Sequence, residues 1–177
     1  MSNIYLIGYR CTGKSTVGKL LADRRRMAFL DTDGFLTGYV GCSVTEIIER
    51  DGWKRFRELE RFALEEAAAG DGLVVATGGG IVLAPENREL MAKTGIVVWL
   101  KAGVKTLAKR MGADGVTDSQ RPSLTGKGSV DEIAEVLKER HSLYEEAADV
   151  TIETDTMTPD QVAGAILKRL LLTRDAS

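Results

Sequence analysis

The segment from Gly8 to Ser15, GYRCTGKS, has the residue types and spacing of a phosphate-binding loop. Its glycines allow backbone N–H groups to converge on phosphate oxygens, and the following helix N-terminus adds partial positive charge. Lys14 can reach the β- and γ-phosphates, and the Ser15 hydroxyl can bind Mg²⁺. The loop lies between a short apolar run and a helical pattern, as the motif requires. The residues expected to contact the nucleotide are Gly8, Arg10, Cys11, Thr12, Gly13, Lys14, Ser15 and Thr16.

Asp31 and Asp33 follow the second apolar run, at the predicted end of a strand. The third apolar run ends in glycines instead of an aspartate, which disfavours a motor ATPase or a switch GTPase and requires a carboxylate elsewhere to support the metal. Since the aspartates are two residues apart, their side chains point the same way if the strand continues. Carboxylates beside Mg²⁺ and phosphates can hold the water shell of the metal and accept a substrate proton. The alternative is that both aspartates cap a turn or a helix.

Three consecutive glycines, Gly78, Gly79 and Gly80, follow the predicted strand at 73–76. They lie at the carboxyl end of this strand, where open α/β sheets bind ligands. A tight connection between a strand and a helix normally needs one glycine, and each further glycine has an entropic cost. The triplet therefore favours close approach of the backbone to a ligand.

Two arginines occupy helix positions where a cation is unexpected. At about 100° per residue, Arg140 lies in the middle of an apolar stripe, and Glu60 and Arg57 lie at the centre and edge of another. The residues of the first stripe are Ile133, Val136, Leu137, Tyr144 and Ala147. A buried cation needs an anionic partner or a ligand. One interpretation is a structural ion pair among these three charged residues; the other is that both arginines bind a substrate carboxylate while Glu60 orients Arg57.

Short apolar runs alternate with helical patterns, and they predict the elements that position these residues. Strands are expected at 4–7, 28–30, 73–76, 96–100 and 150–152, and helices at 15–26, 43–51, 53–69, 85–93, 104–110, 129–148 and from 158 onward. Strands whose apolar residues do not alternate with polar ones are typical of a parallel sheet covered on both faces. The sequence therefore predicts an α/β fold of three layers, α/β/α, with a five-stranded parallel sheet. The segment 111–128 is polar and is expected to be a lid or a surface loop.

Length and composition narrow the class of protein. The chain has 177 residues, 44% hydrophobic and 28% charged, which predicts one globular domain over 1–177. The net charge of −2 disfavours a nucleic-acid partner. The two cysteines are too few for a disulfide scaffold and favour a reducing compartment. No apolar run approaches the ~20 residues that span a bilayer, and the N-terminus lacks the pattern of a signal peptide. We therefore expect a cytoplasmic protein that does not bind membranes.

Together these motifs make the sequence similar to the shikimate kinases over essentially the whole chain. Besides the phosphate-binding loop, the matching segments are Phe29-Leu30-Asp31-Thr32-Asp33, Phe56-Arg57-Glu58-Leu59-Glu60, Gly78-Gly79-Gly80, Arg121-Pro122 and Glu139-Arg140-x-x-Leu143-Tyr144. The resemblance implies transfer of the γ-phosphoryl group of ATP to the 3-hydroxyl of shikimate, a step towards chorismate and the aromatic amino acids. It also implies a fold related to the nucleoside monophosphate kinases, with a mobile lid at 111–128.

The resemblance also implies a role for each matched residue. Asp33 would act as the base, and Asp31 would support Mg²⁺ together with Ser15. The residues that would hold shikimate are Asp33, Arg57, Gly78, Gly79, Gly80 and Arg140. Lys14 and Arg121 would act on the phosphates during catalysis, and Arg110 would lie against adenine. Cys11 departs from the family pattern, which often has glycine at this position.

Two other functions fit part of the pattern. A gluconate or nucleotide kinase would share the architecture, and gluconate is also a polyhydroxy acid, so Arg57 and Arg140 alone do not exclude it. The glycine triplet together with Asp33 favours shikimate. A catalytically silent sensor should have lost a residue of the loop or the base, yet Lys14, Ser15, Asp31, Asp33 and Arg121 are all present. We therefore expect an enzyme, and we expect it to be a monomer.

Overall fold

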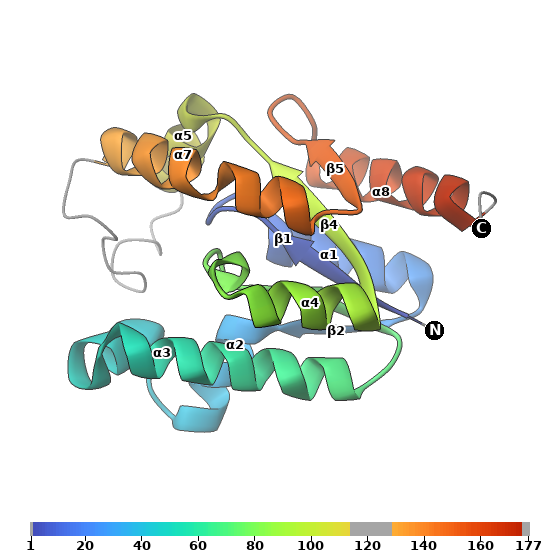
Figure 1. Ribbon diagram of the computed structural model, residues 1–177. Helices are drawn as coiled ribbons and strands as arrows, with labels where there is room; N and C mark the ends of the chain where they lie inside the picture. Colours follow the sequence, from blue (N-terminus) through green and yellow to red (C-terminus); the bar gives the residue numbers. More distant parts are fainter. Residues whose placement is uncertain (1, 114–128, 175–177) are drawn as a thin grey trace.

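A five-stranded parallel sheet forms the centre of the molecule (Figure 1). The structure is a computed structural model, and it describes residues 2–113 and 129–174. The strands are β1 (Asn3–Ile7), β2 (Ala28–Asp31), β3 (Leu73–Ala76), β4 (Gly95–Lys101) and β5 (Val150–Glu153). Their order is β2-β3-β1-β4-β5, and every neighbouring pair is parallel. The predicted sheet is confirmed, with each strand displaced by no more than one residue at either end.

Helices cover both faces of this sheet (Figure 1). The helices are α1 (Lys14–Arg25), α2 (Thr32–Val40), α3 (Val44–Ala69), α4 (Pro85–Thr94), α5 (Val104–Ala113), α7 (Ser129–Ala147) and α8 (Pro159–Arg174), with a short 3-10 helix, η1 (Ile81–Leu83). Helices α1 and α8 pack on one face, and α3, α4 and α7 pack on the other. The predicted three layers are therefore confirmed. None of the described helices is both long enough and apolar enough to span a membrane.

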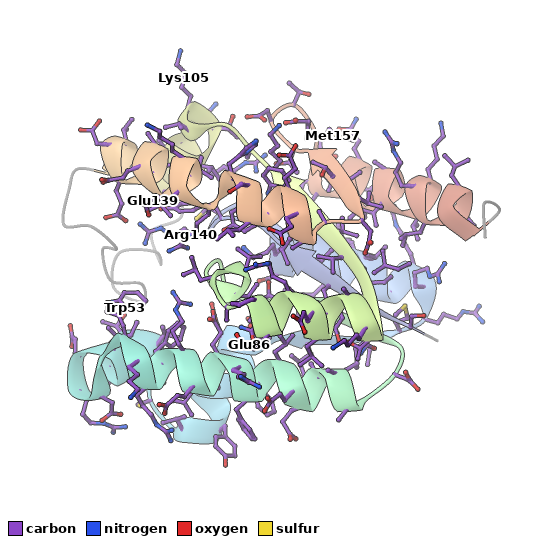
Figure 2. All side chains as sticks on the ribbon, in the orientation of Figure 1. Trp53, Glu86, Lys105, Glu139, Arg140 and Met157 are labelled. Atoms are coloured by element: carbon purple, nitrogen blue, oxygen red, sulfur yellow. The ribbon has the colours of Figure 1, made fainter. Side chains whose placement is uncertain are left out.

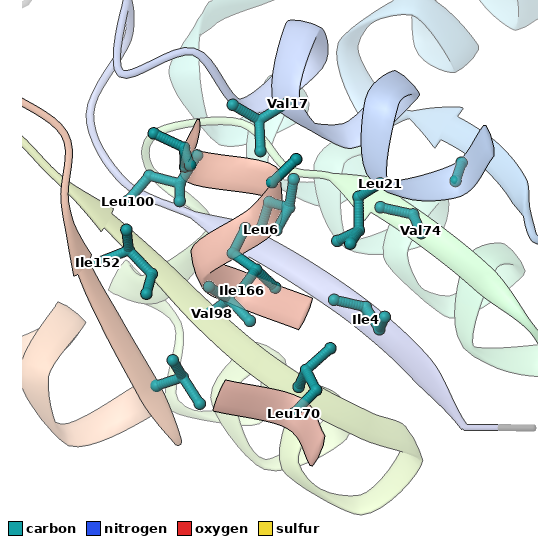
Figure 3. Packing of buried hydrophobic residues seen from close by; sticks show 14 residues of the cluster. Ile4, Leu6, Val17, Leu21, Val74, Val98, Leu100, Ile152, Ile166 and Leu170 are labelled. Carbon is teal, nitrogen blue, oxygen red and sulfur yellow. The ribbon is translucent and has the colours of Figure 1, made fainter. Parts of the chain in front are cut away.

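The alternation of side chains along β1 shows why the strands have continuous apolar runs. Ile4 and Leu6 point into the core beneath α1 and α8, where they meet Leu21 and Ile166 (Figure 3). Tyr5 and Ile7 point into the opposite core beneath α3, α4 and α7. All of these strand side chains are buried. Both faces of the strand must therefore be apolar, as expected for a sheet covered on both sides.

Capping interactions form at the starts of two predicted helices. At the start of α3, the Ser43 side chain accepts from the Glu46 backbone N–H, and the Glu46 carboxylate accepts from the Ser43 N–H at 2.7 Å. At α8, the Thr158 N–H donates to the Gln161 side chain at 2.8 Å. Gly52 has φ 81° and ψ 169°, which kinks α3. The predicted helices 43–51 and 53–69 are thus the two arms of one kinked helix.

Helix α2 was not predicted, and it changes the expected arrangement of the two aspartates. Strand β2 ends at Asp31 and α2 begins at the next residue, so the strand does not continue to Asp33. Asp31 instead caps α2, accepting from the backbone N–H groups of Asp33 at 3.1 Å and Gly34 at 3.2 Å. The α2 sequence has weak helix formers, including two glycines. Its Leu36 is buried against α3, so tertiary packing stabilises the helix.

Candidate active site

A single cleft of about 670 Å³ lies at the carboxyl ends of the strands, where parallel α/β sheets bind ligands. The predicted site residues that line it are Arg10, Cys11, Gly13, Lys14, Ser15, Thr16, Asp31, Asp33, Arg57, Gly78, Gly79, Gly80 and Arg140. The predicted residues Gly8, Thr12 and Arg110 do not line it. Arg121 and residues 114–128 of the predicted lid lie outside the described residues.

The phosphate-binding loop is shaped by its backbone. Gly13, the N-cap of α1, has φ 96°, and Cys11 has φ 61°. Cys11 therefore adopts the left-handed conformation that favours glycine, at a cost of about 1–2 kcal/mol for an L-residue with a side chain. The buried Lys14 Nζ donates to the carbonyl oxygens of Gly8 and Tyr9, each at 2.8 Å. The loop thus binds its own lysine through backbone atoms.

Ser15 and Asp31 bring two oxygen ligands together at the start of α1. The Ser15 Oγ donates to Asp31 Oδ2 at 2.5 Å, while the other carboxylate oxygen caps α2. Among residues 2–113 and 129–174, no group of three or more His, Cys, Asp or Glu side chains could hold a metal ion. Mg²⁺ commonly takes one or two protein oxygen ligands and completes its shell with phosphates and water. The Ser15–Asp31 pair fits this ion.

Arg57 and Glu60 form an ion pair on one wall of the cleft. The Arg57 Nη1 donates to Glu60 Oε2 at 2.6 Å. The Glu60 side chain is only 1% exposed and that of Arg57 is 29% exposed. Burial raises the pKa of Glu60, and the Arg57 charge opposes that rise. The Arg57 guanidinium also lies 5.4 Å from the Trp53 ring centre and 5.2 Å from that of Phe56. Arg57 is therefore held on several sides.

The glycine triplet makes room for these side chains. A Cβ atom at Gly78 would lie 2.6 Å from Glu60 Oε1 and 3.1 Å from Asp33 Oδ1, and one at Gly80 would collide with the guanidinium of Arg57. The sequence suggested close approach of a ligand as the reason for the triplet. The structure shows a second reason, which is that Glu60, Asp33 and Arg57 already occupy the space beside it.

Arg140 faces the cleft from α7. Its backbone and side chain are only 8% exposed. Its Nη1 donates to the Gly79 carbonyl oxygen at 3.1 Å, and its Nε has no hydrogen-bond partner among the described residues. Figure 2 shows Arg140 extending from α7 towards α3, with Trp53 on the facing side. Within the described part of the chain, Glu60 forms its ion pair with Arg57 and not with Arg140. Arg140 thus brings a cationic group to the cleft, and no ion pair to it is found among residues 2–113 and 129–174.

Two other predicted nucleotide residues have protein partners. Arg10 forms an ion pair with the buried Glu132 of α7, and its guanidinium lies 5.5 Å from the Tyr9 ring centre. Arg110 donates to the Thr154 carbonyl oxygen at 2.7 Å and to the Cys11 carbonyl oxygen at 3.5 Å. These contacts tie the loop to α7 and to the segment after β5.

The sequence reasoning missed several residues that line the cleft. Trp53 and Phe56 form an apolar and aromatic wall around Arg57, and Thr77 lies just before the glycine triplet. Trp53 is 39% exposed, which is unusual for a tryptophan on an apolar stripe. The available signal was the position of both aromatic residues within about one helical turn of Arg57.

Comparisons with known proteins agree on one family. The family model described as shikimate kinase matches residues 10–171. The shikimate kinase of Nitratidesulfovibrio vulgaris is 46% identical over 152 residues, covering 86% of each chain. Shikimate kinase 2 of Escherichia fergusonii is 45% identical over 163 residues, covering 92% of this chain and 88% of that protein.

Solved structures give the same result. A shikimate kinase from Acinetobacter baumannii, solved in complex with shikimate, is 35% identical with a TM-score of 0.91, and the match covers 98% of this chain and 94% of that one. A gluconokinase from Sinorhizobium meliloti is 18% identical with a TM-score of 0.55, a likeness of fold alone. The match of the family model over most of the chain and the identity to curated relatives lead to one conclusion: the chain belongs to the shikimate kinase family.

Proposed function

We propose that this protein transfers the γ-phosphoryl group of ATP to the 3-hydroxyl of shikimate, giving shikimate 3-phosphate and ADP. Its family makes it an ATP-dependent kinase. One observation carries the assignment of the site: a single cleft joins the phosphate-binding loop to Asp33, Arg57 and Arg140. A phosphate donor and an acidic, hydroxylated acceptor can therefore meet in one cleft.

On the nucleotide side, the loop amides and Lys14 would bind the phosphates. Lys14 Nζ donates hydrogen bonds to two loop carbonyl oxygens. When ATP binds, its phosphate oxygens would accept hydrogen bonds from the same amino group. Ser15 and Asp31 would hold Mg²⁺, which when bound neutralises charge on the phosphate oxygens. On the outer side of the loop, Arg110 contacts the Cys11 carbonyl oxygen.

On the acceptor side, the two arginines would bind the carboxylate of shikimate. Glu60 neutralises one of the two guanidinium charges, so the Arg57, Glu60 and Arg140 group carries one net positive charge when Glu60 is ionised. That charge matches one carboxylate. Bidentate contacts from arginine to carboxylate fix orientation as well as affinity. The glycine backbone would contact the same ligand, because all three glycines line the cleft.

Asp33 would accept the proton of the 3-hydroxyl. As the acceptor oxygen bonds to the γ-phosphorus, the bond from phosphorus to the ADP oxygen breaks and the O–H proton passes to the Asp33 carboxylate. Asp33 lies in the first turn of α2, where the helix dipole stabilises a carboxylate. Burial and the Asp33 charge raise the pKa of the nearby Glu60, and the Arg57 charge opposes that rise.

The direct test measures ADP release from ATP and Mg²⁺ with shikimate, gluconate or a nucleoside monophosphate as the acceptor. We expect turnover with shikimate alone, and mass spectrometry should find a product heavier by one phosphoryl group. Equal turnover with gluconate would contradict the assignment. Binding of shikimate without any ADP formation would support the silent sensor instead.

The quaternary state, the location and the domain boundaries belong to the same proposal. We propose a cytoplasmic monomer whose residues 1–177 form one domain. Light scattering coupled to size-exclusion chromatography should give the mass of one chain, and cell fractionation should recover the activity with the cytoplasmic fraction.

A further inference from the structure

Two side chains of α7 bind the same backbone oxygen in the glycine triplet. The Gly79 carbonyl accepts from the Tyr144 hydroxyl at 2.5 Å and from the Arg140 Nη1 at 3.1 Å. A carbonyl oxygen has two lone pairs, so these two donors use its full capacity. Arg140 and Tyr144 are four residues apart in α7, which places them on the same face of the helix. Tyr144 therefore shares an acceptor with the arginine that faces the cleft.

Tyr144 is held rigidly. Its side chain is fully buried, and its ring stacks on Trp99 of β4 with ring centres 5.5 Å apart and planes inclined by 19°. Burial raises the pKa of Tyr144 to about 12, so the hydroxyl keeps its proton at neutral pH and acts as a donor. It does not line the cleft with the residues described above. The hydroxyl thus joins the sheet core to the loop without facing the ligand volume.

This hydrogen bond holds the central peptide of a turn, which the Ile81 N–H closes by donating to the Gly78 carbonyl oxygen at 3.2 Å. Glycine has no side chain to limit its dihedral angles, so hydrogen bonds must fix the orientation of this peptide. No peptide bond in the described residues is cis, so the Gly80 N–H points opposite to the Gly79 carbonyl. Holding that carbonyl against α7 directs the Gly80 N–H away from α7. The same oxygen also fixes one amino group of Arg140.

We propose that Tyr144 is a positioning residue for the acceptor, which holds the Gly79–Gly80 peptide and the Arg140 guanidinium in the orientation that binds shikimate. The inference rests on the proposed function, because it assigns Arg140 and this peptide to the shikimate site. Without the hydroxyl, the Gly79 carbonyl keeps only Arg140 as a donor. The peptide and the Arg140 guanidinium then gain conformational entropy, and the loss of this entropy on binding weakens the affinity for shikimate.

The test compares Tyr144→Phe with Tyr5→Phe. Tyr5 is a matched control because it is also fully buried, and its hydroxyl bonds to Thr94 at 2.7 Å away from the cleft. In Tyr144→Phe we expect the KM for shikimate to rise about five- to tenfold, the effect of losing one buried hydrogen bond. The kcat and the KM for ATP should stay unchanged. Tyr5→Phe should leave all three constants unchanged, whatever its effect on thermal stability.

Tyr144→Phe removes no carbon atom and leaves the Gly79 carbonyl with a donor, so the variant should fold, and a thermal melt checks this. An unchanged KM for shikimate in Tyr144→Phe would overturn the inference, as would an equal rise in Tyr5→Phe. The proposed function is tested separately by the wild-type protein. If the wild type does not phosphorylate shikimate, the proposed function fails and the inference fails with it; if it does, the variant alone decides.

A double-mutant cycle tests whether Tyr144 acts through Arg140. Residues that act through one another show non-additive effects. In an Arg140→Leu background, the loss of the Tyr144 hydroxyl should weaken shikimate binding by a smaller factor than in the wild type, measured by equilibrium titration. An identical factor in both backgrounds would show that Arg140 is not positioned by Tyr144.

Discussion

The two sides of the cleft are built in different ways. The side that we propose binds the nucleotide is one continuous stretch of chain, 8–16, in which Lys14 binds two carbonyl oxygens of the loop. The acceptor side is assembled from side chains of α2, α3 and α7 and from the loop after β3. There, an aspartate, a glutamate and two arginines lie around the glycine triplet.

This difference predicts where substitutions have large effects. Backbone amides remain when a side chain changes. The nucleotide side should therefore tolerate a residue such as Cys11 in place of the glycine that is common in the family, provided that the chain can adopt the required dihedral angles. On the acceptor side each charged side chain makes a contact that no backbone atom can replace. Removal of one charge there also changes the net charge around its neighbours. Such a change costs free energy, because an unpaired charge is unfavourable in a buried environment.

The largest effect should follow from Asp33→Asn. The amide keeps the size of the side chain but cannot accept the substrate proton, so kcat should fall by about 10²–10⁴-fold or more. The cap of α2 belongs to Asp31 and is retained, so the melting temperature should change little. Steady-state kinetics and a thermal melt measure both quantities. Turnover close to that of the wild type would exclude Asp33 as the base.

Arg140→Leu should have the next largest effect. It removes a contact to the shikimate carboxylate worth about 2–5 kcal/mol, so shikimate affinity should fall by orders of magnitude while ATP affinity barely changes. Glu60 keeps its partner Arg57, and the Gly79 carbonyl keeps the Tyr144 hydroxyl, so both of these buried groups retain a hydrogen bond. Calorimetric titration and a thermal melt test this. A badly destabilised protein that still binds shikimate would contradict the role of Arg140.

Gly80→Ala tests whether the triplet serves the side chains around it. The new methyl group would collide with the guanidinium of Arg57, which is partly exposed and can move away. We expect the affinity for shikimate to fall about tenfold, as a charge-assisted contact is weakened. Gly79→Ala is the matched control, because its nearest contact is Arg10 N at 3.4 Å. Equal losses in both variants would favour a general need for glycine in this loop.

The smallest effect should come from Cys11→Gly on the nucleotide side. Cys11 has φ 61°, where a side chain costs about 1–2 kcal/mol, and glycine relieves this cost. Glycine also increases the entropy of the unfolded chain, and this effect cancels about 0.4–1 kcal/mol of the stability gained. The net gain should be about 0.5 kcal/mol in urea unfolding. Cys11→Ala keeps the Cβ atom and should show no gain. Destabilisation by Cys11→Gly would show that the cysteine side chain itself stabilises the loop.

Features that depend on neighbouring residues could be predicted from the sequence. The strands follow from continuous apolar runs, and the starts of α3 and α8 follow from capping boxes at Ser43 and Thr158. The phosphate-binding loop was identified because the residues of its motif lie within eight consecutive positions, 8–15. In each case the residues that define the feature are close together in the chain, so their spacing along the sequence is enough to predict the local structure.

Features that depend on distant residues appeared only with the tertiary structure. Helix α2 has weak propensity and forms because Leu36 packs against α3, so its only signal was the alternative that the aspartates cap a turn or a helix. The order of the glycine triplet, Glu60 and Asp33 in space depends on β2 and β3 lying side by side. The choice of Arg57 over Arg140 as the partner of Glu60 depends on where α7 packs. Helical periodicity determines which residues face inward, but the packing of separate elements determines which charges meet, because electrostatic partners are chosen by distance in space and not along the chain.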